Sequence, residues 1–134
     1  MIARLALALV AAVVLAACGE DSPADVGGRD SFEASLRIRL DPDGAGPKAA
    51  RTARLRCPSE RRARACRILR DLPRSAFAPV PPGTACTEQY GGPERGRIRG
   101  RVRARSVDGR FERTNGCEIN RFEQVRPLLR LARY

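Results

Sequence analysis

The cysteines are the residues whose type and spacing could do chemistry in this chain. There is no histidine, and the five cysteines are Cys18, Cys57, Cys66, Cys86 and Cys117. The last four form an even set, which predicts two disulfides with three possible pairings. A zinc site is disfavoured because histidine and a close Cys-x-x-Cys pair are both absent. The pattern indicates structural cysteines, with no metal and no cofactor.

Catalytic chemistry is disfavoured on similar grounds. The sequence has no histidine, no obvious pair of nucleophile and base, and no glycine-rich phosphate loop. We therefore expect a protein that binds or inhibits, and not an enzyme.

Residues 78–93 (APVPPGTACTEQYGGP) hold Cys86 in a segment that cannot be helical. Prolines precede it and a Gly-Gly-Pro run follows, and proline lacks the backbone donor that a helix needs. We expect residues 84–90 to be extended and exposed, and fixed from behind if Cys86 bonds a distant cysteine. A rigid segment loses less conformational entropy on binding, as a substrate-like protease inhibitor requires. The alternative is a structural surface loop that holds a disulfide, which is common in exported domains.

Residues 1–18 are typical of an export signal. Arg4 precedes an apolar run over residues 5–17 that is short for a membrane span. The run ends in Leu-Ala-Ala-Cys, which resembles a bacterial lipobox with Cys18 as the lipidated residue; secretion with cleavage nearby is the alternative. We expect an exported protein, either lipid-anchored at the outer face of the bacterial cell membrane or extracellular. Residues 19–30 would be a flexible tether and residues 31–134 the domain.

The chain is strongly basic, with a net charge of +11, and Lys48 is its only lysine. Such a charge favours anionic partners, which include phosphate polymers, anionic lipid and acidic proteins. A GC-rich genome also produces an excess of arginine, alanine, glycine and proline, so the charge alone does not define a site. Export argues against nucleic acid as the partner.

Hydrophobic periodicity predicts the elements that position these residues. Apolar and polar residues alternate over residues 31–40 and again over 49–57, which predicts an antiparallel pair of strands. Helical spacing follows over residues 59–72, where Ser59 could cap the start and Pro73 ends the helix.

The C-terminal half is expected to add two strands and a second helix. Arginine at every odd position from 95 to 103 predicts a strand, and this arginine ladder is either an anion-binding stripe or an outer sheet face. Residues 107–113 would return after a turn at Ala104-Arg105 or Asp108-Gly109. Asn115-Gly116 would end that strand, and a short helix over residues 119–126 would stop at Pro127. The sum is an α+β layered domain with about four or five antiparallel strands and two helices.

Three blocks of residues resemble the Streptomyces subtilisin inhibitor family. They are residues 77–83 (FAPVPPG), 86–93 (CTEQYGGP) and 113–119 (RTNGCEI), and the layout of the four cysteines also fits. The resemblance runs from Cys57 to about Leu129. It implies an antiparallel sheet of about five strands with two helices, the disulfides Cys57–Cys66 and Cys86–Cys117, a hairpin turn at Ala104-Arg105, and often a homodimer through the sheet.

Members of this family inhibit serine proteases by a substrate-like mechanism, with the reactive bond two residues after the third domain cysteine. Carried onto this chain, that bond is Glu88–Gln89, and Glu88 enters the specificity pocket of the protease. The disulfide at Cys86 would hold the leaving amine in place, so that religation competes with hydrolysis. The residues that contact the protease would be Ala85, Cys86, Thr87, Glu88, Gln89 and Tyr90.

Two features depart from the family pattern. The pocket residue is commonly Met, Lys or Arg, whereas Glu88 is acidic, so subtilisin-like enzymes should accept it poorly and trypsin-like enzymes should reject it. The expected partner is a serine protease, either glutamate-specific or subtilisin-like. The lipobox is the second departure, because most relatives are freely secreted. The alternative function is a non-inhibitory basic lipoprotein that keeps the inhibitor fold and binds the cell envelope.

Overall fold

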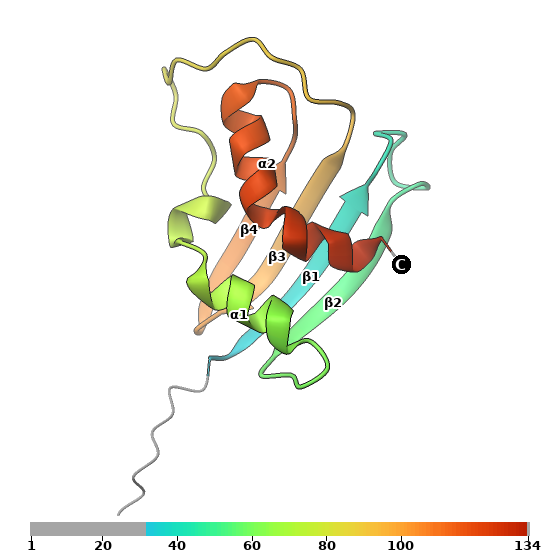
Figure 1. The fold of residues 1–134 in the computed structure, drawn as a ribbon, viewed down its shortest axis with the longest axis vertical. Helices are drawn as coiled ribbons and strands as arrows, with labels where there is room; N and C mark the ends of the chain where they lie inside the picture. Colours follow the sequence, from blue (N-terminus) through green and yellow to red (C-terminus); the bar gives the residue numbers. More distant parts are fainter. Residues whose placement is uncertain (1–31, 134) are drawn as a thin grey trace, which may run out of the picture.

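The computed structural model describes residues 32–133 as a four-stranded antiparallel sheet with helices on one face (Figure 1). The strand order is β2-β1-β3-β4. The α+β class, the two α-helices and the two disulfides are confirmed. The expected signal peptide, the lipobox cysteine Cys18 and the tether lie outside the described residues. The elements are β1 (Ala34–Asp41), β2 (Arg51–Cys57), α1 (Ala63–Asp71), η1 (Arg74–Phe77), β3 (Arg95–Val102), β4 (Arg105–Phe111), α2 (Gly116–Leu129) and η2 (Arg130–Ala132).

The sheet has four strands in the described part of the chain, which is the lower of the two numbers expected from the pattern and one fewer than the family resemblance implied. The fifth strand was implied by the family resemblance. The remaining extended segment, residues 84–90, forms no strand. Proline and glycine at both of its ends break the ladder of hydrogen bonds and carry the segment away from the sheet.

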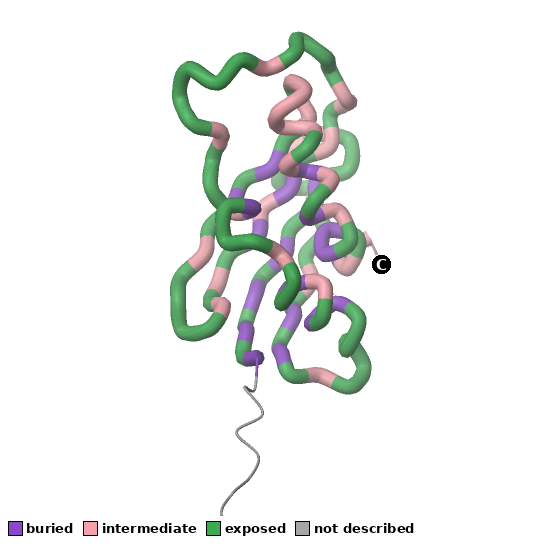
Figure 2. Tube along the Cα trace, turned by 60° about the vertical axis from the view of Figure 1, so that its left-hand side comes forward, coloured by how far each residue is buried: buried purple, intermediate pink, exposed green. Residues whose placement is uncertain are grey.

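The hydrophobic core lies between the sheet and the helices. Along β1 the side chains of Leu36, Ile38 and Leu40 are buried, and the residues between them are exposed, as the alternation predicted. Figure 2 shows this alternation along the strands. Helix α2 covers the same face with Phe122 and Val125, which are 1% and 0% exposed. No helix within residues 32–133 is both long enough and apolar enough to cross a membrane.

The β3–β4 hairpin turns at Arg103-Ala104, and neither expected turn is correct. Both residues have positive φ, at 48° and 62°, as a two-residue hairpin loop of type I′ requires. The register pairs Val102 with Arg105, which places Asp108 and Gly109 inside β4. A side chain at Gly109 would come within 2.7 Å of the Phe111 ring, so this glycine makes room for core packing and does not form a turn.

Helix α1 begins at Ala63, and Ser59 does not cap it. Its N-cap is Arg62, which has no capping side-chain hydrogen bond. The disulfide Cys57–Cys66 ties the end of β2 to the first turn of the helix. The residues between these cysteines turn the chain from the sheet onto its inner face, which delays the start of the helix.

Helix α2 is longer at both ends than residues 119–126. It begins at Gly116 because Asn115 is its N-cap, with the Asn115 side chain accepting a hydrogen bond from the Glu118 backbone N–H at 3.0 Å. It continues through Pro127 to Leu129. Leu128 and Leu129 are 0% and 1% exposed, so their burial outweighs the hydrogen bond that proline removes.

Candidate functional site

The Cys86 loop, which we define as residues 78–93, contains no helix or strand. It arches past the N-terminal end of α2 (Figure 1). A turn precedes its extended part, where the Pro81 carbonyl accepts hydrogen bonds from the Thr84 backbone N–H at 3.3 Å and from the Thr84 hydroxyl at 2.7 Å. Gly83 in this turn has φ +78°, which fits a Pro-Gly turn of type II. The turn directs the chain outward before Cys86.

The first anchor of the loop lies at Cys86 and Thr87. Cys86 is bonded to Cys117 in the first turn of α2, with 5.4 Å between the Cα atoms, which is the pairing that the resemblance implied. The Thr87 carbonyl accepts a hydrogen bond from the Gly116 backbone N–H at 3.0 Å. A side chain at Gly116 would come within 2.1 Å of the Thr87 hydroxyl oxygen. A larger residue at position 116 would therefore force the Thr87 side chain to move.

The second anchor lies at Gly91. Its backbone N–H donates a hydrogen bond to the Arg113 carbonyl at 2.7 Å. A side chain at Gly91 would come within 2.9 Å of Ile119, so the backbone here packs directly on α2. Both anchors therefore tie the loop to the same short segment, from Arg113 to Cys117.

Glu88, Gln89 and Tyr90 lie between the two anchors and are exposed. Within the described residues they take part in no hydrogen bond or salt bridge. Tyr90 is 66% exposed and is the one large hydrophobic side chain of residues 32–133 that is open to solvent. The loop is thus anchored on both sides of the Glu88–Gln89 peptide bond, and the residues between the anchors are exposed.

The six residues predicted to contact a protease form one continuous surface segment. Five of them are exposed and Cys86 is half-buried, with its sulfur turned back to Cys117. In Figure 2 the loop is exposed along most of its length. The six residues are Ala85, Cys86, Thr87, Glu88, Gln89 and Tyr90.

The sequence did not predict which residues outside the loop hold it in place. Glu94, directly after the loop, accepts hydrogen bonds from Arg113 at 3.0 Å and from Arg133 at 2.8 Å. These partners are far apart in the sequence, so no local pattern could have revealed them. Asn115 could have been found, because an N-cap residue followed three positions later by Glu118 is a helix-start signal.

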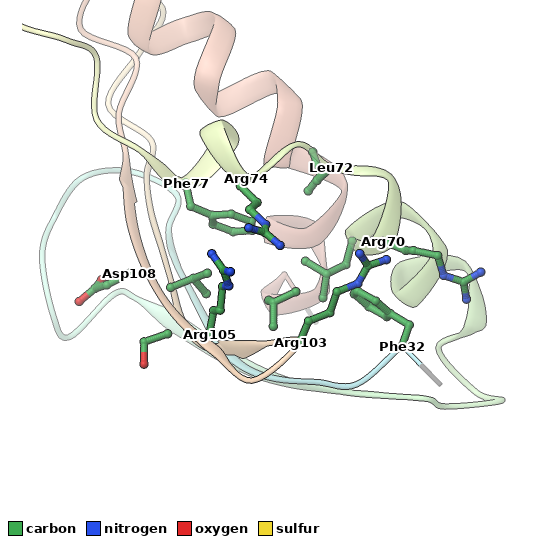
Figure 3. Close-up of a pocket in the computed structure, with 12 residues that line it drawn as sticks. Phe32, Arg70, Leu72, Arg74, Phe77, Arg103, Arg105 and Asp108 are labelled. Carbon is green, nitrogen blue, oxygen red and sulfur yellow. The ribbon is translucent and has the colours of Figure 1, made fainter. Parts of the chain in front are cut away.

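A separate cavity of about 270 Å³ lies beside the β3–β4 turn, at the other end of β3 from the Cys86 loop. Phe32, Leu72 and Phe77 contribute apolar walls (Figure 3). The guanidinium groups of Arg70 and Arg103 lie 5.7 and 5.4 Å from the centre of the Phe32 ring, as cation–π contacts. None of the residues that line this cavity belongs to the Cys86 loop.

Within the described residues, the Cys86 loop is the feature that could act on another molecule. No group of three His, Cys, Asp or Glu side chains in residues 32–133 is placed to hold a metal ion. What the geometry can do is present a peptide bond to another molecule while both flanks stay fixed.

Comparison with protein-family models, curated proteins and solved structures gives no match for this chain. Only the resemblance of the three sequence blocks points to the inhibitor family, and the function has to be argued from the geometry of the loop.

Proposed function

We propose that this protein inhibits serine proteases by presenting Glu88–Gln89 as a substrate-like reactive bond. The observation that supports this most is the pair of anchors around an exposed peptide bond. The Thr87 carbonyl accepts a hydrogen bond from Gly116 on one side, and the Gly91 N–H donates one to Arg113 on the other. An ordinary flexible loop would be cut and released, whereas a loop with this support stays in place.

The anchors explain how cleavage could be reversed. The serine of the protease attacks the Glu88 carbonyl carbon, the bond to the Gln89 nitrogen breaks, and that nitrogen leaves as an amine after it gains a proton. The acyl half stays tied through the Cys86–Cys117 disulfide, and the amine half stays tied two residues away at Gly91. The amine therefore remains close to the acyl carbon, and its high effective concentration favours religation over attack by water.

The side chain of Glu88 sets the class of protease. It is exposed and has no salt-bridge partner within residues 32–133, so it is available to enter a specificity pocket. Burying a carboxylate without a positive partner is costly, so the matching pocket carries basic or hydrogen-bond-donating groups. A glutamate-specific serine protease fits this requirement better than a subtilisin-like one, and a trypsin-like pocket would repel the charge.

The two disulfides are compatible with an exported protein, because such bonds persist in oxidising compartments. The proposal places the inhibitor outside the cytoplasm, with lipid attachment at Cys18 as its expected anchor.

The test is inhibition by the oxidised full chain of a glutamate-specific serine protease, a subtilisin and trypsin. The wild type should inhibit the glutamate-specific enzyme, and Glu88→Lys should lose that inhibition and gain inhibition of trypsin. Glu60→Lys is the matched control, because Glu60 is exposed and lies outside the loop, and it should behave as wild type. A folded chain that inhibits none of these enzymes, or that is consumed by cutting at Glu88–Gln89, would overturn the proposal.

A further inference from the structure

The outer face of the sheet, which we define as the outward side chains of the four strands, is dominated by arginine. It lies opposite the helices, and its acidic side chains within the described strands are Asp41, at the end of β1, and Asp108 on β4. Its arginines are Arg37 and Arg39 on β1, Arg54 and Arg56 on β2, Arg95, Arg97, Arg99 and Arg101 on β3, and Arg110 on β4.

Three of these arginines stand in one row across three strands. The register places Arg37 directly opposite Arg54 on one side and directly opposite Arg99 on the other. Directly opposed side chains lie about 5 Å apart at their Cβ atoms, and like charges at that spacing repel. The row is therefore a place where a bound anion would relieve repulsion as well as gain contacts.

Asp108 forms its hydrogen bonds outside this row. It lies opposite Arg99 in the register, but its carboxylate accepts two hydrogen bonds from Arg97, at 2.9 and 2.7 Å. Those hydrogen bonds lower the pKa of Asp108. Arg37, Arg54 and Arg99 keep no salt-bridge partner within residues 32–133.

The row opens into a hollow of about 390 Å³. It is lined by four arginines and by three residues of β1 and β3, which are Arg37, Arg54, Arg56 and Arg99 and Ser35, Leu36 and Gly100. Gly100 has φ +148°, and a side chain there would come within 2.0 Å of the Ser35 carbonyl oxygen. The absence of a side chain at Gly100 therefore lets β1 and β3 approach each other closely.

We propose that the outer face binds a flexible phosphate polymer, with one phosphate group seated in this hollow between Arg37, Arg54 and Arg99. Guanidinium groups bind phosphate oxygens with paired hydrogen bonds, and several of them converge here without an acid. The neighbouring arginines on the same face bind the next phosphates of the chain. This site differs from the arginine ladder expected from sequence, because Arg97 is paired with Asp108 and Arg103 stacks on Phe32.

Two other occupants fit the face less well. A second copy of this chain would bring the same positive charges against each other. A membrane surface would attract this face by charge alone, because the exposed large hydrophobic residue of the described chain, Tyr90, lies in the Cys86 loop and no apolar side chain of the face could insert. Charge complementarity therefore points to a soluble polyanion.

The experiment measures binding of the oxidised full chain to labelled inorganic polyphosphate over a range of salt concentrations. The triple variant Arg37→Gln, Arg54→Gln, Arg99→Gln should bind about tenfold or more weakly, and the slope of log affinity against log salt should fall by about two. The matched control is Arg61→Gln, Arg64→Gln, Arg67→Gln, which removes the same charge from exposed positions at α1. It should keep its affinity within about threefold, because it leaves the hollow intact.

Three outcomes would overturn the proposal: equal losses in both triple variants, no binding of wild type at low salt, or binding to phosphatidylglycerol vesicles without binding to polyphosphate. A second measurement uses the wild-type chain alone, so that the proposal can be tested even if the triple variant does not fold. Polyphosphate should raise the Tm of the wild-type chain, and sodium chloride at the same ionic strength should not. The triple variant in the hollow should still inhibit the protease that the wild type inhibits, so the two proposals stand or fall separately.

Discussion

Arg113 donates a hydrogen bond to Glu94 at 3.0 Å and so joins the end of the Cys86 loop to the segment before α2. The same carboxylate accepts a hydrogen bond from Arg133 at 2.8 Å, and Arg126 lies 3.9 Å from it. The Glu94 side chain is 14% exposed, so these charges are only partly screened by water. One acid therefore fixes the loop, the last part of α2 and the C-terminal residues to one another.

Glu94→Gln should lower the free energy of unfolding by about 1–3 kcal/mol, because it leaves three neighbouring arginines without their shared charge. Urea unfolding measures the change. Glu112→Gln is the matched control, because Glu112 is exposed and forms no salt bridge within the described residues, and it should change little. Equal effects of the two substitutions would show that Glu94 is not a specific support.

Loss of the Cys86–Cys117 disulfide should convert the inhibitor into a substrate. The double variant Cys86→Ser, Cys117→Ser should lose about 2–4 kcal/mol of stability and release the acyl side of the reactive bond. The protease should then cut Glu88–Gln89 with repeated turnover, which mass spectrometry and progress curves detect. The variant Cys57→Ser, Cys66→Ser is the control, because that disulfide lies at α1, away from the loop. It should lose stability and still inhibit at a temperature where it is folded.

The pair formed by Arg97 and Asp108 should make stability depend on acid pH. Its hydrogen bonds lower the pKa of Asp108 in the folded protein. The pair therefore contributes stability above the ordinary pKa of the unfolded carboxyl, about 3.9, and loses it as pH falls through the lowered value. A double-mutant cycle with Arg97→Gln and Asp108→Asn should give a small coupling energy near neutral pH, which decreases as pH falls through the lowered pKa of Asp108. A coupling energy that does not change with pH would contradict this.

Arg37→Glu should stabilise the fold. The glutamate would attract its two cross-strand neighbours, Arg54 and Arg99, which Arg37 repels. Pairs of this kind contribute about 0.2–1 kcal/mol each, so the Tm should rise by a few degrees. The control is Arg56→Glu, because Arg56 faces Ser35 and has no charged residue directly opposite on β1. A Tm that rises equally in both variants would indicate net charge, and not the row, as the cause.

The parts of the fold that the sequence predicts are those fixed by local pattern. Strand β1 was expected from its alternation because one of its faces is buried and the other is open. The turn at Arg103-Ala104 could not be found this way, since neither residue is typical of positive φ. The Asp108-Gly109 pair has stronger turn propensity, and only the packing of Phe111 against Gly109 explains why it lies in a strand.

The same division applies to the candidate site. The prolines and glycines around Cys86 predict an exposed loop, because each of them restricts or frees the backbone conformation of the residues next to it in the chain. The anchors at Gly116 and Arg113 depend on how α2 lies against the loop, and Glu94 depends on contacts with residues up to 39 positions away. Such contacts belong to the folded molecule and leave no periodic signal.

Pro127 was expected to end α2, and it lies inside the helix instead. It cannot donate a hydrogen bond to the Glu123 carbonyl, so the helix carries this cost in order to bury Leu128 and Leu129. Pro127 itself is exposed. Pro127→Ala should therefore restore the hydrogen bond without disturbing the core and raise the free energy of unfolding by about 1–3 kcal/mol.

Pro82→Ala is the control for Pro127→Ala. It shows how the loss of a proline changes stability through the unfolded chain alone, where no helical hydrogen bond is restored. Pro82 precedes Gly83 in the turn before Cys86, where proline favours the observed backbone. Its replacement should lower the free energy of unfolding by about 0.4–1 kcal/mol, because the unfolded chain gains freedom. Urea unfolding of both variants should thus give changes of opposite sign. A loss of stability in Pro127→Ala would mean that the proline shapes the end of α2 in a way that its lost hydrogen bond does not capture.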